Sequence, residues 1–172
     1  MSTLIAGLGN VLMGDDAIGP TLVHYLKARY EFADEVELED LGTPGIDLAQ
    51  HLANRDTVIV LDAIEDPARP PGTVCRFDAG TLAAARTSTR QDAHAPDLGE
   101  SLRLSVLHGA APRRMVLIGV VAASCELGDR MSAGLQNEFE AIVRQVVTAL
   151  GELQIPMVPR QNAEVPDCWW LR

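Results

Sequence analysis

The chain has 172 residues, enough for one domain. We expect this domain over residues 1–151 and an extended tail over residues 152–172. The content of 47% hydrophobic and 22% charged residues is typical of a globular fold. A formal net charge of −10 argues against nucleic acid as a partner, because binding to phosphates needs a basic face. No apolar stretch reaches the roughly 18 residues of a membrane span and no leader peptide is recognisable, so we expect a cytoplasmic protein with no membrane contact.

The first predicted elements are a strand, a loop and a helix. A short apolar run at residues 4–6 ends in a glycine-rich loop that carries Asp15 and Asp16, and apolar residues then recur at helical spacing over residues 16–30. Ligands of open α/β sheets bind beyond the carboxyl ends of the strands, so chemistry is expected first at this corner. Of the two adjacent acids we expect Asp15 to cap the helix.

The rest of the chain alternates strands with helices. Apolar and acidic residues alternate over residues 36–41, as in a half-buried strand, whereas residues 57–63 and 115–122 are continuous apolar runs typical of central strands. A brief edge strand is expected at residues 73–78, and the clearest helical stripe follows Ser132, a suitable cap. This pattern predicts a three-layer α/β/α sandwich around a mainly parallel, twisted, roughly five-stranded sheet.

The predicted sheet brings acidic residues from two loops to one crevice. If the first three strands follow the order 2-1-3, the strand before Gly7 and the strand ending at Asp62 are neighbours at the point where the chain reverses direction. Asp62 then faces the loop of Asp15 and Asp16, and carboxylates brought together need a compensating cation or proton. With His94 they make a set of oxygen, oxygen and nitrogen ligands, which suits nickel, zinc or manganese.

Simpler interpretations stay open for these residues. Asp62 could bond only to loop amides, His94 could be a solvated surface residue, and Cys125 could be a partly buried, inert thiol.

Two other protein families fit the sequence less well. A dinucleotide-binding loop would need a glycine where Leu12 stands, and a phospho-acceptor receiver domain would need a lysine after its last strand, whereas Lys27 is the only lysine.

One segment carries a more specific signal. Residues 7–19, GLGNVLMGDDAIG, are similar to the N-terminal signature of the nickel-iron hydrogenase maturation endopeptidases. Three further segments occur in the order of that family: DLGTPG at residues 40–45, the strand end at Asp62, and His94 before an apolar helix. The chain departs from the family pattern at residues 119–122, where it reads GVVA in place of Gly-x-Gln/Glu-Pro.

This resemblance implies a compact α/β/α protease that removes a C-terminal peptide from a hydrogenase large-subunit precursor after nickel insertion. The family's metal-interacting acid, aspartate and histidine correspond to Asp16, Asp62 and His94, which are also the implied catalytic residues. Five further residues would contact the substrate: Gly9, Asn10, Gly42, Thr43 and Gly45. We expect the glycines to leave room for close approach of the substrate backbone.

An open set of three ligands without nearby thiolates predicts no permanently bound cofactor, so the nickel would be carried by the substrate. In the cut itself, the metal could polarise the carbonyl or a water, or a carboxylate could act as general base. Two rival functions stay open, a non-catalytic nickel-dependent chaperone of the precursor and an ordinary metallohydrolase with its own zinc. A monomer is expected, since the enzyme must dock on a large protein surface.

Overall fold

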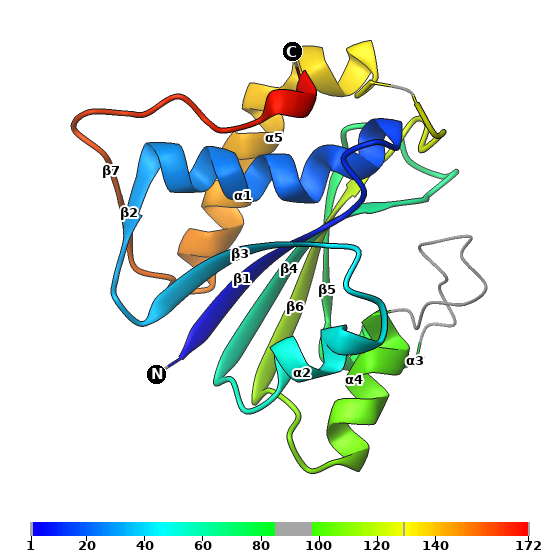
Figure 1. Cartoon of the computed structure of the whole chain (residues 1–172), viewed down its shortest axis with the longest axis vertical. Helices are drawn as coiled ribbons and strands as arrows, with labels where there is room; N and C mark the ends of the chain where they lie inside the picture. Colours follow the sequence, from blue (N-terminus) through cyan, green and yellow to red (C-terminus); the bar gives the residue numbers. More distant parts are fainter. Residues whose placement is uncertain (1, 85–97, 129, 172) are drawn as a thin grey trace.

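The computed structural model describes residues 2–84, 98–128 and 130–171. Its centre is a five-stranded sheet in which only the edge strand β5 is antiparallel (Figure 1). In spatial order the strands are β3 (Val36–Gly42), β1 (Thr3–Leu8), β4 (Thr57–Ile64), β6 (Arg114–Val121) and β5 (Val74–Asp78). The second and third predicted strands correspond to β3 and β4. The predicted order 2-1-3 is confirmed, because β1 lies between them.

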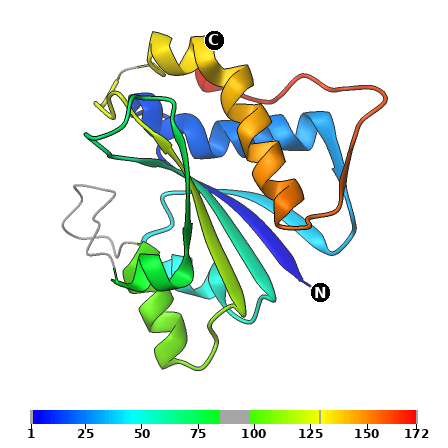
Figure 2. The same ribbon diagram turned by 180° about the vertical axis from the view of Figure 1, so that it is seen from behind.

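Helices cover both faces of the sheet and complete the predicted three-layer sandwich. One face is covered by α1 (Ile18–Arg29) and α5 (Ala133–Glu152), and the other by α2 (Leu48–Leu52), α3 (Ala79–Ala84) and α4 (Leu98–Leu107) (Figure 2). Each face buries its own apolar cluster, since a sheet covered on both sides is apolar on both sides. Within the described residues, none of the helices is both long and apolar enough to span a membrane.

The continuous apolar runs form the central strands, as predicted. β4 is buried from Val58 to Ile64 and β6 from Met115 to Val121, because helices pack on both of their faces. β3 lies at the sheet edge and keeps only Val36 buried, which agrees with the half-buried pattern of its sequence.

The two long helices begin in different ways. Ser132 caps α5 as predicted, because its hydroxyl oxygen accepts a hydrogen bond from the Leu135 N–H at 3.3 Å. α1 begins at Ile18, later than predicted, after a 3-10 turn, η1 (Gly14–Ala17), and neither start has a side-chain cap. The prediction that Asp15 caps this helix is therefore wrong.

The chain after α5 runs back along α1 (Figure 1). A short strand, β7 (Met157–Pro159), pairs antiparallel with β2 (Tyr30–Phe32) beyond the end of α1. A final 3-10 turn, η3 (Trp169–Leu171), places the indole N–H of Trp170 3.0 Å from Thr21 Oγ1, to which it donates a hydrogen bond. The tail thereby covers part of α1 rather than leaving the body of the protein.

Glycines allow α1 to cross the sheet at very short distance. A Cβ atom at Gly19 would lie 2.1 Å from the carbonyl oxygen of Leu8 and 2.4 Å from that of Leu61. Gly7 faces the same contact, since a Cβ there would lie 2.6 Å from the Gly19 carbonyl oxygen. Only glycines permit this approach, which fixes the start of α1 against the ends of β1 and β4.

The variant Gly19→Ala tests this contact. The added methyl group would meet backbone atoms on two strands, which cannot move separately, so we expect a loss of about 3 kcal/mol in the free energy of unfolding. Gly151→Ala is the matched control, because no atom lies within 4 Å of its Cβ position in α5 and it should stabilise by up to about 1 kcal/mol. Urea unfolding measures both; equal stability of the two variants would contradict the close approach.

Candidate active site

The candidate site lies at the carboxyl ends of β1 and β4, where the chain reverses direction. Gly7 in β1 is opposite Leu61 in β4, and η1 packs against β4. This arrangement brings Asp16 and Asp62 to the carboxyl end of the sheet, which we call the acidic edge. Asp16 is 8% exposed and Asp62 is 3% exposed. The juxtaposition predicted from strand order is therefore present.

Asp15 is a fully buried anchor for a distant part of the chain. Its Oδ2 accepts hydrogen bonds from the backbone N–H groups of Ala123 at 2.8 Å and Ser124 at 3.3 Å, and its Oδ1 accepts from Ser132 at 2.6 Å. The backbone N–H of Asp15 donates to the Ser124 carbonyl oxygen at 2.8 Å. Asp15 thus joins η1 to the connection between β6 and α5, a role that the local sequence did not reveal.

Asp16 points toward the loop that follows β1. Its Oδ2 accepts a hydrogen bond from the Asn10 backbone N–H at 2.6 Å. Its other oxygen, Oδ1, has no hydrogen-bond donor among the residues that the structure describes. One carboxylate oxygen therefore holds the loop, and the second is the one that can reach a ligand.

Asp62 stands near the end of β4, and its Oδ1 accepts a hydrogen bond from the following Ala63 N–H at 2.9 Å. The third predicted ligand, His94, lies outside the described residues. Among the residues that are described, no three His, Cys, Asp or Glu side chains are grouped so as to hold a metal ion. Asp16 and Asp62 lie at the same end of the sheet, and a role as metal ligands stays a prediction for both of them and for His94.

The pKa of the Cys125 thiol reflects the negative charge at the acidic edge. Burial, followed by the nearby carboxylates of Asp16, Asp15, Glu65 and Asp62, raises the pKa of its thiol from 9.0 to about 12. Four acids therefore act on one half-buried sulfur atom, and the thiol stays protonated at neutral pH. Glu65 is not among the predicted site residues; its position directly after a central strand, β4, was the available signal.

The predicted substrate-binding glycines differ in the space around them. A Cβ at Gly9 would lie only 1.8 Å from the Asp16 carbonyl oxygen, so the protein's own turn, not a substrate backbone, fills the space expected there. The Gly9 N–H donates to the Gly42 carbonyl oxygen at 2.9 Å, joining the loops after β1 and β3. Gly45, two residues beyond Thr43, has a φ of 57° and no atom within 4 Å of its Cβ position. Open space next to backbone is thus found at Gly45, while a substrate contact at Gly9, as at Asn10, stays a prediction.

Two histidines outside the predicted set have structural partners. His24 Nε2 lies 3.1 Å from Asp40 Oδ2, and its ring meets Trp170 edge-on with centroids 5.3 Å apart. His51 Nδ1 lies 3.6 Å from Glu39 Oε2. Both link helices to β3 and need no ligand to explain them.

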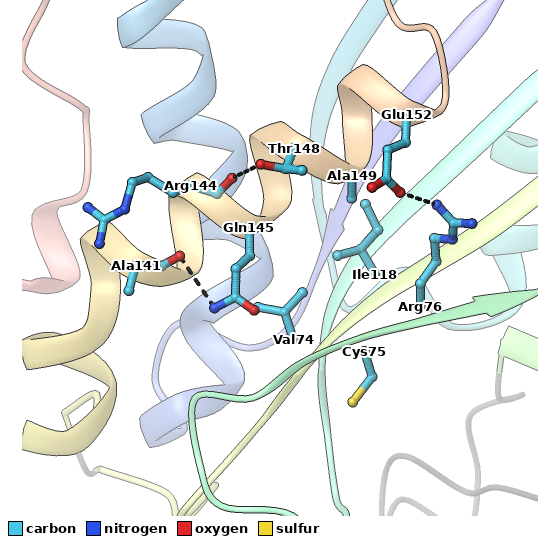
Figure 3. Close-up of a pocket in the computed structure, with 10 residues that line it drawn as sticks. All are labelled: Val74, Cys75, Arg76, Ile118, Ala141, Arg144, Gln145, Thr148, Ala149 and Glu152. Carbon is cyan, nitrogen blue, oxygen red and sulfur yellow. Dashed lines mark hydrogen bonds and ion pairs between the residues drawn. The ribbon is translucent and has the colours of Figure 1, made fainter.

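A hollow of about 540 Å³ lies elsewhere, between α5 and the edge strand β5 (Figure 3). An ion pair between Arg76 and Glu152, 3.0 Å from nitrogen to oxygen, crosses one end of it. None of the candidate site residues lines this hollow, which is open and of mixed polarity. The acidic edge, not this hollow, is where the carboxylates gather.

The fold and the acidic edge together define a class of protein, a three-layer α/β/α fold with buried carboxylates at the switch point of a mainly parallel sheet. A phosphate-binding enzyme does not fit, because adjacent acids would repel the ligand's charge at the start of the first helix.

Comparison with known proteins identifies the family. The model of the hydrogenase maturation protease family matches residues 20–152. The hydrogenase 2 maturation protease of Escherichia coli strain K12 is 33% identical over 161 residues, covering 94% of this chain and 98% of that protein. The hydrogenase expression/formation protein HoxM of Azotobacter vinelandii is 34% identical over 160 residues, covering 92% of this chain and 77% of that protein.

Solved structures agree with this result. The hydrogenase maturating endopeptidase HybD from E. coli superposes with a TM-score of 0.78 at 30% identity, covering 95% of this chain and 100% of that one. The chain belongs to the hydrogenase maturation protease family, and it is a hydrolase of the peptidase class.

Replacing Asp15 tests its role as an anchor. Asp15→Ala leaves three backbone N–H groups without their acceptor, so we expect a loss of about 2–4 kcal/mol in the free energy of unfolding. Asp66→Ala, which removes one bond to the Ala68 N–H and a surface ion pair with Arg69, should lose much less. Urea unfolding measures both, and a loss for Asp15→Ala no larger than that of the control would contradict the anchor.

The charge of the edge can be measured through Cys125. Asp16→Asn removes the largest of the carboxylate contributions that raise the thiol pKa, so the pKa should fall and alkylation of Cys125 at pH 9 should become faster. Mass spectrometry of the alkylated peptide separates Cys125 from the two other cysteines. Asp66→Asn is the control, because Asp66 does not act on this thiol; an unchanged rate in Asp16→Asn would contradict the proximity of Asp16 to Cys125.

Proposed function

We propose that the protein is the endopeptidase that removes the C-terminal peptide of a nickel-loaded hydrogenase large-subunit precursor, and that Asp16, Asp62 and His94 recognise the nickel. The observation that carries the proposal is a pair of nearly buried carboxylates, one in the turn η1 that follows β1 and one near the end of the adjacent strand β4. The name of the E. coli relative, a hydrogenase 2 maturation protease, supports the class of substrate.

The nickel in this proposal is part of the substrate. Two carboxylate oxygens and one imidazole nitrogen suit a first-row divalent metal, and Asp16 keeps one oxygen without a donor in the described part of the chain. A precursor without metal would offer the gathered acids no cation to offset their mutual repulsion. Recognition through the metal would therefore make cleavage follow nickel insertion.

Hydrolysis of a peptide bond needs a water to attack the carbonyl carbon and a proton for the departing nitrogen. Asp16 or Asp62 can take the proton from the attacking water as general base, and the acid so formed can return it to the leaving amine. Nickel next to the scissile bond would polarise the carbonyl or acidify the water. Cys125 is a poor nucleophile in comparison, because its raised pKa keeps the thiol protonated.

Cleavage of the precursor by single variants tests the proposal. We expect nickel-loaded precursor to lose a defined C-terminal peptide with the wild type, and the rate to fall by at least about 100-fold in Asp16→Asn, Asp62→Asn and His94→Ala. Asp66→Asn, a carboxylate in a surface loop, should cleave at the wild-type rate. Mass spectrometry of the precursor follows the reaction, and metal-free precursor should stay intact.

Other outcomes would favour the rival functions. Binding of a cognate precursor without any cleavage would favour a nickel-dependent chaperone and overturn the proposal. Stoichiometric zinc in the purified protein would favour an ordinary metallohydrolase, because we expect no permanently bound metal. The enzyme should sediment as a monomer, free to dock on the larger precursor.

A further inference from the structure

We propose that Leu12, Leu127 and Ile46 form an apolar rim that docks an extended apolar segment of the precursor on both sides of the acidic edge. This inference rests on the proposed function and deepens it, because it names the chemistry of the substrate next to the site of cleavage. The three side chains are 52%, 75% and 73% exposed, and each belongs to a loop that leaves the carboxyl end of a parallel strand.

Leu12 is held close to Asp16 by a chain of hydrogen bonds. The Leu12 N–H donates to Asn10 Oδ1 at 3.0 Å, and the Asn10 N–H donates to Asp16 Oδ2 at 2.6 Å. The Met13 N–H donates to the Asn10 carbonyl oxygen at 3.0 Å, which closes a tight turn with Leu12 inside it. Turns of this kind favour polar residues and glycine, so the turn itself gives no reason for a leucine that points into solvent.

Leu127 stands beside Leu12 although it comes from another loop. The Gly128 N–H donates to the Leu12 carbonyl oxygen at 2.9 Å, so the loops after β1 and β6 are joined where both leucines are exposed. Figures 1 and 2 show these two loops side by side from opposite directions. Leu127 also follows Cys125 closely, and the thiol of Cys125 lies within the influence of Asp16. The two leucines therefore border the acids rather than standing alone on the surface.

Ile46 belongs to the loop on the other side of β1. It lies in a short 3-10 turn, η2 (Gly45–Asp47), that follows β3, and this loop is tied to the β1 loop by the bond from the Gly9 N–H to the Gly42 carbonyl oxygen. The open backbone at Gly45 is its direct neighbour. Apolar side chains thus occur on both sides of the β1 corner, with Asp16 at that corner.

The charge of the acidic edge and the apolar side chains of the rim together determine which kind of segment can bind there. Four carboxylates act at this edge of a chain whose net charge is −10, so an acidic segment would be repelled. A neutral or cation-bearing segment with apolar side chains would bury the rim and leave its cation to the acids. The nickel-loaded precursor of the proposed function carries such a cation, so an apolar segment beside its nickel would meet both conditions.

The test compares exposed leucines at the two ends of the sheet. Leu12→Ser/Leu127→Ser should raise the KM for nickel-loaded precursor by about tenfold while kcat stays within about twofold, because the lost contacts bind the segment without touching the reacting bond. Ile46→Ser should raise KM in the same direction. Leu107→Ser is the matched control, since Leu107 is 78% exposed at the end of α4, near the amino end of β6, and its KM should not change.

Thermal unfolding checks that the serine variants keep their fold, as exposed positions allow. An unchanged KM in the double variant, with normal cleavage by the wild type, would overturn the rim and leave the proposed function standing. If the wild type does not cleave, the dissociation constant of the precursor for wild type and double variant tests the rim separately. A double variant that only changes sedimentation, from dimer to monomer, would make the rim a contact between copies of this chain and overturn the proposal.

Discussion

One buried carboxylate holds the candidate site together. Asp15 accepts hydrogen bonds from three backbone N–H groups in the connection between β6 and α5, and no part of its surface is exposed. Because water cannot replace these bonds inside the protein, the connection has one favourable arrangement relative to η1. The positions of Cys125 and Leu127, and the start of α5 at Ser132, all depend on it.

The two adjacent aspartates, Asp15 and Asp16, hold different parts of the chain. Within one turn of 3-10 helix, neighbouring side chains point in different directions, so Asp15 faces the interior while Asp16 faces the loop after β1. The first fixes the backbone around the site, and the second keeps an oxygen toward the edge where a ligand would arrive. Such bonds hold both acids in one arrangement within the structure.

The position of Asp16 in turn depends on contacts without side chains. Gly7 and Gly19 let α1 approach β1 until backbone meets backbone, and Gly9 leaves its space to the Asp16 carbonyl oxygen. These glycines therefore serve the turn that presents the acid. The tail packs along α1, and the acidic edge is formed by loops at the ends of the parallel strands. The glycines thus fix the turn of Asp16, while other loops complete the acidic edge around it.

The sequence by itself determined the sandwich, the strand order, the family and the two acids at the switch point. These features follow from local patterns, because a strand covered on both faces must be apolar throughout and alternating strands and helices allow few topologies. Only the tertiary structure decided which aspartate turns inward. The partners of Asp15 lie between 108 and 117 residues away in the chain, so no local pattern could contain them. The same reason hid the meeting of Leu12 with the turn of Leu127, which exists only because two distant loops share a hydrogen bond.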